Sequence, residues 1–225
     1  KRDSDWPYGR IAYHFKYLDE DHDSRAKNFL GQRGDLDGAD IIKIICDEES
    51  TARFIARHLY HFFVADEAPV PSWNEIGPRD VEAVEELVQT YFDSNHDLSS
   101  MLKTLFNSGF FKSDRSRYKK VKGPAEFAVG VLKISKEFDI PNRNMIPKYR
   151  QIGWMGQVLN NPPSVEGWMG ANDWISTGSM VQRVNFASEI MGDLERPGIR
   201  NIVDQVKAEC GPDNLPETLV DACLI

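Results

Sequence analysis

The sequence lacks any long hydrophobic run: among its 225 residues, no apolar stretch approaches the roughly 18 residues that a membrane-spanning helix needs. It also lacks a collagen period, low-complexity tracts and any internal repeat of about 20–50 residues, which excludes fibrous and repeat architectures. Hydrophobic residues make up 41% of the chain and charged residues 28%. This composition can supply a globular core, so global disorder is excluded as well.

Positive charge is in short supply. Lysine and arginine together number 27 against 35 aspartates and glutamates, which gives a formal net charge of −8. An acidic chain lacks the field that concentrates nucleic acid around it, so we expect no nucleic-acid partner. The one basic stretch, residues 112–122, is expected to be a solvated loop between helices or, alternatively, a local contact for an anion or a partner.

Cysteine is rare, and the three present do not make a disulfide framework. Cys46 lies in an apolar stretch and is expected to be buried. Cys210 and Cys223 can pair in an oxidising compartment, but nothing in the sequence demands it. Because no Cys-x-x-Cys pattern occurs, a structural zinc site is disfavoured.

The common short catalytic motifs are missing too. The chain has no Gly-x-Ser-x-Gly elbow, no P-loop and no Gly-x-Gly-x-x-Gly turn. A calcium loop starting at Asp35 fails, because Asp40 and Cys46 stand where it needs glycine and glutamate. The sequence therefore reveals no reaction and no cofactor.

Helical periodicity dominates from Asp40 onward. Before it, an alternating pattern around 13–17 predicts a short strand, and 26–30 is expected to return as its partner. The expected helices span 41–46, 51–64, 78–92, 98–106, 124–138, 148–159, 177–191, 199–209 and 217–224. We therefore predict a mainly α fold: a multi-helix orthogonal bundle around one core, with a short N-terminal β-hairpin or irregular arm.

The same pattern predicts three parts. Residues 1–38 form the arm, 39–192 the helical core domain, and 193–225 a C-terminal helical segment. The core domain includes a Gly/Pro/Trp loop at 161–175.

Local signals predict how individual helices begin and which faces they bury. Asp40 and Asp97 are expected to cap helices, and Pro124 with Glu126 is typical of a helix start. In the helix at 51–64, one apolar stripe is expected to face the core: Phe54, Ile55, Leu59, Phe62 and Phe63.

Histidines supply the first candidate site. His22 and Asp23 are adjacent, and Lys27 follows four residues later. This segment is either a turn in which Asp23 bonds its own backbone, or a ligand, metal or proton-transfer site. His58 and His61 can share a helix face, but no spacing pattern supplies the further ligands that a metal needs.

A tryptophan-rich loop supplies the second. Three of the five tryptophans fall within 153–174, among several glycines and prolines. Trp168 and Trp174 are expected to anchor the loop on neighbouring helices, or to hold a sugar ring or a partner peptide between them. Arg183 is expected to cap carbonyls of this loop or to pair with Glu126 or Asp173.

These residues occur in a recognisable order. It runs His22-Asp23-x-x-x-Lys27, Thr51-Ala52-Arg53-Phe54-Ile55-Ala56, Pro124-Ala125-Glu126, Gly156-Gln157, Pro162-Pro163-x-Val165-x-Gly167-Trp168-x-Gly170-x-x-x-Trp174-Ile175 and Arg183. The order resembles the C-terminal half of the bacterial family called domain of unknown function 1800, over residues 13–190. The chain departs from that family's pattern at Arg25 and Ala171, where the family usually has glycine.

The resemblance implies a longer protein, exported to the periplasm, cell surface or exterior, whose N-terminal half carries its own His- and Glu-rich motifs. A start at Lys1 indicates either a removed leader or a piece of that longer chain. We therefore expect an exported helical module that binds a partner protein or a glycan. The alternative is the C-terminal half of a metal-assisted hydrolase whose main catalytic residues lie elsewhere. The candidate ligand- or partner-binding residues are His22, Asp23, Lys27, Glu126, Trp168, Trp174 and Arg183.

Overall fold

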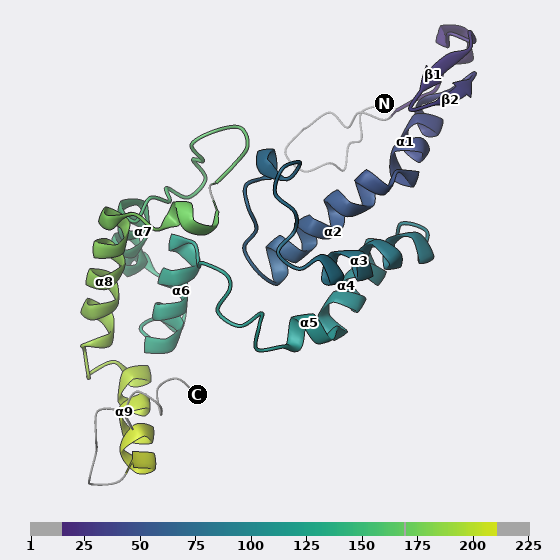
Figure 1. Ribbon diagram of the computed structural model, residues 1–225. Helices are drawn as coiled ribbons and strands as arrows, with labels where there is room; N and C mark the ends of the chain where they lie inside the picture. Colours follow the sequence, from purple (N-terminus) through teal and green to yellow (C-terminus); the bar gives the residue numbers. More distant parts are fainter. Residues whose placement is uncertain (1–14, 169, 211–225) are drawn as a thin grey trace. The chain divides into compact units, whose positions relative to one another are not determined.

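The computed structural model describes residues 15–168 and 170–210 (Figure 1). The described part is mainly α-helical, which confirms the predicted mainly α class. Its α-helices are α1 Gly38–Asp47, α2 Glu49–Phe63, α3 Val81–Asp93, α4 Leu98–Asn107, α5 Gly109–Lys112, α6 Pro124–Ser135, α7 Ile146–Trp154, α8 Thr177–Met191 and α9 Pro197–Cys210. The strands are β1 Lys27–Phe29 and β2 Gln32–Gly34, and short 3-10 turns are η2 Asp19–Asp21, η3 Val70–Ser72, η4 Arg143–Met145 and η5 Ala171–Trp174.

The chain divides into two compact units. One comprises residues 1–58 and 82–105, and the other comprises 59–81 and 106–225. The predicted boundaries at 38 and 192 are not tested by this division and stay a prediction.

In the first unit, the hairpin follows η2 and leads into α1 (purple in Figure 1). β1 and β2 pair antiparallel with Lys27 opposite Gly34 and Phe29 opposite Gln32. Leu30 and Gly31 between them both have positive φ, at 47° and 82°, as a type I′ turn requires. A hairpin was expected, but 26–30 supplies its first strand rather than its second. Residues 15–18 are not a strand, and 13–14 lie outside the described residues.

The cap of α1 lies three residues earlier than expected. Asp37, not Asp40, is the N-cap: its Oδ1 accepts from the backbone N–H groups of Ala39 and Asp40 at 2.8 and 2.9 Å. Asp40 instead accepts the Asp37 N–H at 3.0 Å, which completes a capping box. The expected cap on α4 is confirmed, because Asp97 accepts from the N–H groups of Ser99 and Ser100.

The stripe predicted for α2 is wrong in part. Phe54 and Phe62 are 50% and 68% exposed, whereas Ala52, Ala56 and Tyr60 are buried. The buried residues are also spaced by four, so they form a helix face of their own. Alanines on a helix face let the helix backbone come close to a neighbouring segment. Looking for large apolar side chains alone does not identify such a face.

Polar contacts connect the helices of the first unit. Tyr91 on α3 is 2% exposed, and its hydroxyl donates to the Cys46 carbonyl at 3.0 Å. Arg53 on α2 pairs with both Glu49 and Glu85. Cys46 itself is a free thiol and half-buried rather than fully buried. The Cys210 and Cys223 side chains lie outside the described residues.

The second unit is built on α6, which packs against α7, α8 and α9 (teal to yellow in Figure 1). Its buried core consists of Ala128, Val131, Leu132, Ile152, Met155, Phe186 and Ile190. Lys148 on α7 lies 2.8 Å from Glu189 on α8 and 5.6 Å from the centre of the Phe186 ring. The hydrogen bonds from Lys148 and then Gln151 lower the pKa of the Glu189 carboxyl.

Two helices of this unit end earlier than predicted, each for a local reason. α6 stops at Ser135 because Lys136 has φ 52°, in the left-handed region. α7 stops at Trp154, just before Gly156 turns the chain with φ 106°. The helix predicted at 217–224 lies outside the described residues. None of the helices that the structure describes has the length and apolarity to cross a bilayer.

The C-terminal end of the basic stretch, residues 112–122, makes hydrogen bonds to other residues of this unit. Lys120 donates to the His61 carbonyl at 2.7 Å and lies 3.2 Å from Asp66. The Val121 N–H donates to the other Asp66 oxygen at 2.7 Å. The segment is therefore not a fully solvated loop, since Asp66 holds its C-terminal end.

Candidate functional site

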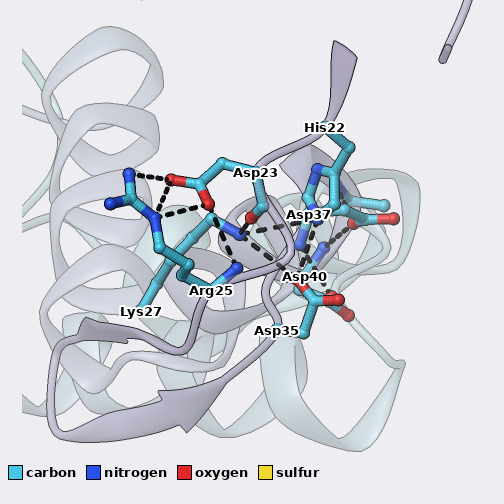
Figure 2. Close-up of polar contacts among 8 residues, drawn as sticks. His22, Asp23, Arg25, Lys27, Asp35, Asp37 and Asp40 are labelled. Atoms are coloured by element: carbon cyan, nitrogen blue, oxygen red, sulfur yellow. Dashed lines mark hydrogen bonds and ion pairs between the residues drawn. The ribbon is translucent and has the colours of Figure 1, made fainter. Parts of the chain in front are cut away.

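The first predicted group, His22, Asp23 and Lys27, lies around the hairpin, where a fourth residue, Asp35, joins it (Figure 2). His22 Nε2 lies 2.9 Å from Asp35 Oδ1, and Lys27 Nζ lies 3.2 Å from the same oxygen. Lys27 Nζ is also 3.5 Å from His22 Nε2 and donates to the Asp23 carbonyl. The hydrogen bonds from His22 and then Lys27 lower the pKa of the Asp35 carboxyl. Asp35 therefore holds the imidazole and the ammonium together.

Asp35 was not predicted as a site residue. The hairpin register explains its place: Lys27 pairs with Gly34, the last residue of β2, and Asp35 follows directly. A sequence prediction with 27–29 as the first strand and 32–34 as the second would have placed Asp35 near Lys27.

The Asp23 carboxylate is directed elsewhere, toward Arg25 (Figure 2). Arg25 Nε and Nη2 donate to its two oxygens at 2.9 and 2.7 Å, and the Arg25 backbone N–H adds a bond of 3.1 Å. These bonds lower the pKa of Asp23 to about 2. Asp23 thus bonds its own local backbone, as the turn interpretation expected. The Arg25 guanidinium therefore occupies both oxygens of the Asp23 carboxylate.

Metal binding finds no ready site in what the structure describes. Within residues 15–168 and 170–210, no three or more His, Cys, Asp or Glu side chains gather closely enough to hold a metal ion. His61 Nδ1 accepts the Glu67 N–H at 2.9 Å, and His58 packs its ring 4.4 Å from that of Phe54. Both histidines therefore have local structural contacts.

Glu126 has a helix-capping role. Its Oε2 accepts the Gly123 N–H at 3.0 Å at the start of α6, as the helix-start signal predicted. Arg183 on α8 was expected to cap carbonyls of the loop or to pair with Glu126 or Asp173, but in the described part of the chain its Nε and Nη2 have no hydrogen-bond partner. Its guanidinium lies instead 5.4 Å from the centre of the Phe127 ring.

The tryptophans surround a hollow of about 570 Å³. Trp154 comes from the end of α7, Trp168 from the loop and Trp174 from η5. The rings of Trp168 and Trp174 are 6.2 Å apart and inclined at 39°. The remaining lining residues are Met155, Gly156, Val158, Asn161, Pro163, Asp173, Ser176, Gly178 and Ser179.

The three rings differ in exposure. Trp174 is 8% exposed, and Ser179 Oγ donates to its carbonyl at 2.8 Å, so it anchors the loop on α8. Trp168 is half-buried, and Trp154 is 64% exposed. Trp154 was not among the predicted site residues, although it begins the tryptophan-rich segment.

Among the described residues of the loop, two have positive φ. Gly167 has φ 100° and closes a tight turn in which its N–H donates to the Ser164 carbonyl at 3.1 Å. Ala171 has φ 51°, a conformation that its side chain disfavours.

The predicted site residues thus fall into separate groups. His22, Asp23 and Lys27 belong to the first unit, whereas Glu126, Trp168, Trp174 and Arg183 belong to the second. Within each unit, the structure brings His22 to Lys27 and Trp168 to Trp174.

Comparison with known proteins adds the family. The chain matches the family model described as protein of unknown function (DUF1800) over residues 6–224. The chain belongs to this family. The match extends beyond residues 13–190, on which the resemblance was first based. No curated protein and no solved structure matches this DUF1800 chain significantly.

Proposed function

We propose that this DUF1800 chain is a binding module that holds a sugar chain in its tryptophan hollow. The observation that carries the proposal is that the exposed Trp154 and the half-buried Trp168 both line the same hollow. Two tryptophans that line one hollow and stay partly in water present apolar surface, which favours a ligand that covers it.

The polar side chains of the hollow favour a sugar over a purely apolar ligand. Asn161, Asp173 and Ser176 are exposed and line the hollow. Amide, carboxylate and hydroxyl groups match the hydroxyls of a sugar, which both donate and accept hydrogen bonds. Indole rings match the C–H face of a pyranose ring, which is apolar. A volume of about 570 Å³ is in the range of small-molecule sites.

Trp174 has a separate task in this proposal. Because it is buried and bonded through its carbonyl to Ser179, its replacement tests the stability of the loop rather than ligand contact. The binding test therefore uses Trp154 and Trp168.

The experiment measures binding of two soluble probes, tetrasaccharides of β-1,4-linked glucose and of β-1,4-linked N-acetylglucosamine, by calorimetry. We expect at least one to bind, and Trp154→Ala and Trp168→Ala to weaken it by about tenfold or more. Tyr118→Ala is the matched control, since Tyr118 is 90% exposed in the same unit and does not line the hollow. Asp173→Asn keeps hydrogen-bonding capacity and should weaken binding less.

Failure of both tetrasaccharides to bind would contradict the glycan proposal. Equal binding by Trp154→Ala and the wild type would contradict this hollow as its place. Capture of a peptide whose binding Trp154→Ala abolishes would instead support the partner-protein alternative.

Export is part of the same proposal, and its support is the family resemblance. Fractionation of the source cells is expected to find the protein outside the cytoplasm. The metal-assisted hydrolase stays a prediction, since its main catalytic residues were expected outside this chain.

A further inference from the structure

A buried arginine in the second unit has more hydrogen-bonding capacity than its surroundings use. Arg183 on α8 is 7% exposed. Its Nε and Nη2 are buried and have no hydrogen-bond partner among the residues that the structure describes. The Phe127 ring attracts the cation but offers no acceptor lone pair. A buried guanidinium without a hydrogen-bond partner is energetically costly, and an anion bound to it would remove that cost.

The two atoms concerned make up one edge of the guanidinium. That edge presents parallel N–H groups that match the two oxygens of a carboxylate. The chain itself gives an example, because Arg25 uses Nε and Nη2 to hold the two oxygens of Asp23. Arg183 therefore presents the same donor pair that Arg25 uses, here without the carboxylate in the part of the chain described.

Arg183 also lines a hollow of about 390 Å³, distinct from the tryptophan hollow. The other lining residues are apolar: Val121, Phe127, Ile175, Met180, Val184 and Ala187. Ile175, Met180 and Val184 are 50%, 41% and 58% exposed. Burial lowers the pKa of Arg183, yet an arginine stays charged at any physiological pH. The hollow thus combines one cation with an apolar wall.

We propose that this hollow binds a small molecule with a single carboxylate on an apolar body. Because Nε and Nη2 are buried in this structure, binding requires the Arg183 side chain to turn this edge toward the hollow. The carboxylate then bridges Nε and Nη2, and the body covers Ile175, Met180 and Val184. Binding exchanges an uncompensated buried charge for a bidentate ion pair and removes exposed apolar surface from water.

The test uses octanoate as the probe, with octanamide as its uncharged counterpart, on the whole chain. We expect calorimetry to show octanoate binding at least about tenfold tighter than octanamide. Arg183→Met should remove this difference, and Arg183→Lys should weaken octanoate binding because an ammonium lacks the planar fork. Arg150→Met is the control, since it removes an exposed positive charge from the same unit and should leave binding unchanged.

A second variant keeps the test decisive if the Arg183 variants do not fold. Val184 is more than half exposed, so Val184→Asp preserves folding and sets a negative charge at the mouth of the hollow. It should abolish octanoate binding. The proposal is overturned by equal affinity for octanoate and octanamide, by undiminished binding in Val184→Asp or Arg183→Met, or by no binding of octanoate at all. If Arg183→Met folds, is more stable than the wild type, and neither protein binds octanoate, then Arg183 is a buried charge without a ligand.

Discussion

The approach of α9 to α6 gives the sharpest prediction for the second unit. A Cβ atom added at Gly198, the second residue of α9, would lie 2.0 Å from the Ile134 carbonyl oxygen and 2.7 Å from the Ser135 carbonyl carbon. Both obstacles are backbone atoms of α6, so no side chain can rotate away. Reaching an ordinary contact requires the two helices to separate by more than 1 Å.

Such overpacking costs about 3 kcal/mol, at the upper end of the usual range, because the backbone of a helix must move. Alanine recovers about 1 kcal/mol through its higher helix propensity. Gly198→Ala should therefore destabilise the second unit by about 2 kcal/mol and lower its melting temperature by roughly 4–8 °C. The measurement is thermal and urea unfolding followed by circular dichroism.

Gly178 provides the matched control. It is also the second residue of its helix, α8. Apart from its chain neighbours and the nearby backbone of α8, no atom in the described part of the chain lies within 4 Å of a Cβ built there. Gly178→Ala should be neutral or stabilising by up to about 1 kcal/mol. A Gly198→Ala variant that melts at or above the wild type would refute the close approach of α9 to α6.

Three further predictions concern local contacts. Asp23 has a pKa of about 2 in the folded state against an ordinary 3.8, so its ion pair with Arg25 stabilises the fold above about pH 4 and is lost as the pH falls toward 2. Arg25→Gln should return the pKa of Asp23 toward 3.8, which an NMR titration measures. Tyr91→Phe leaves the Cys46 carbonyl without its 3.0 Å donor and should cost about 1–3 kcal/mol in urea unfolding. Ala171→Gly relieves a left-handed φ and should stabilise by up to about 1 kcal/mol net, and a loss of stability would argue against the loop conformation.

Local chemistry predicted most helix positions. Asp97 caps α4 and Pro124 with Glu126 starts α6, because a cap satisfies N–H groups within a few residues of itself. Helix ends were less predictable. The left-handed Lys136 that stops α6 has no sequence signal comparable to glycine.

The candidate sites were predictable only as far as their residues lie close in the sequence. The turn at His22 and the anchoring of the loop by Trp174 follow from nearby residues. Asp35 is thirteen residues from His22 in the sequence, and the hairpin register brings the two side chains together. Trp154 lines the hollow because it is the last residue of α7, where the chain leaves the helix toward the loop.

Helical periodicity predicted a mainly α fold from the amino-acid sequence alone. The order of the motifs, the tryptophan-rich stretch above all, made the family recognisable. The folded arrangement decided that Ala52 and Ala56 are buried while Phe54 is half exposed, and that Arg183 sits beside Phe127 rather than a carboxylate. The physical reason is the same in each case. Spacing along a helix establishes which side chains share a face, but burial and charge compensation depend on which distant segment covers that face.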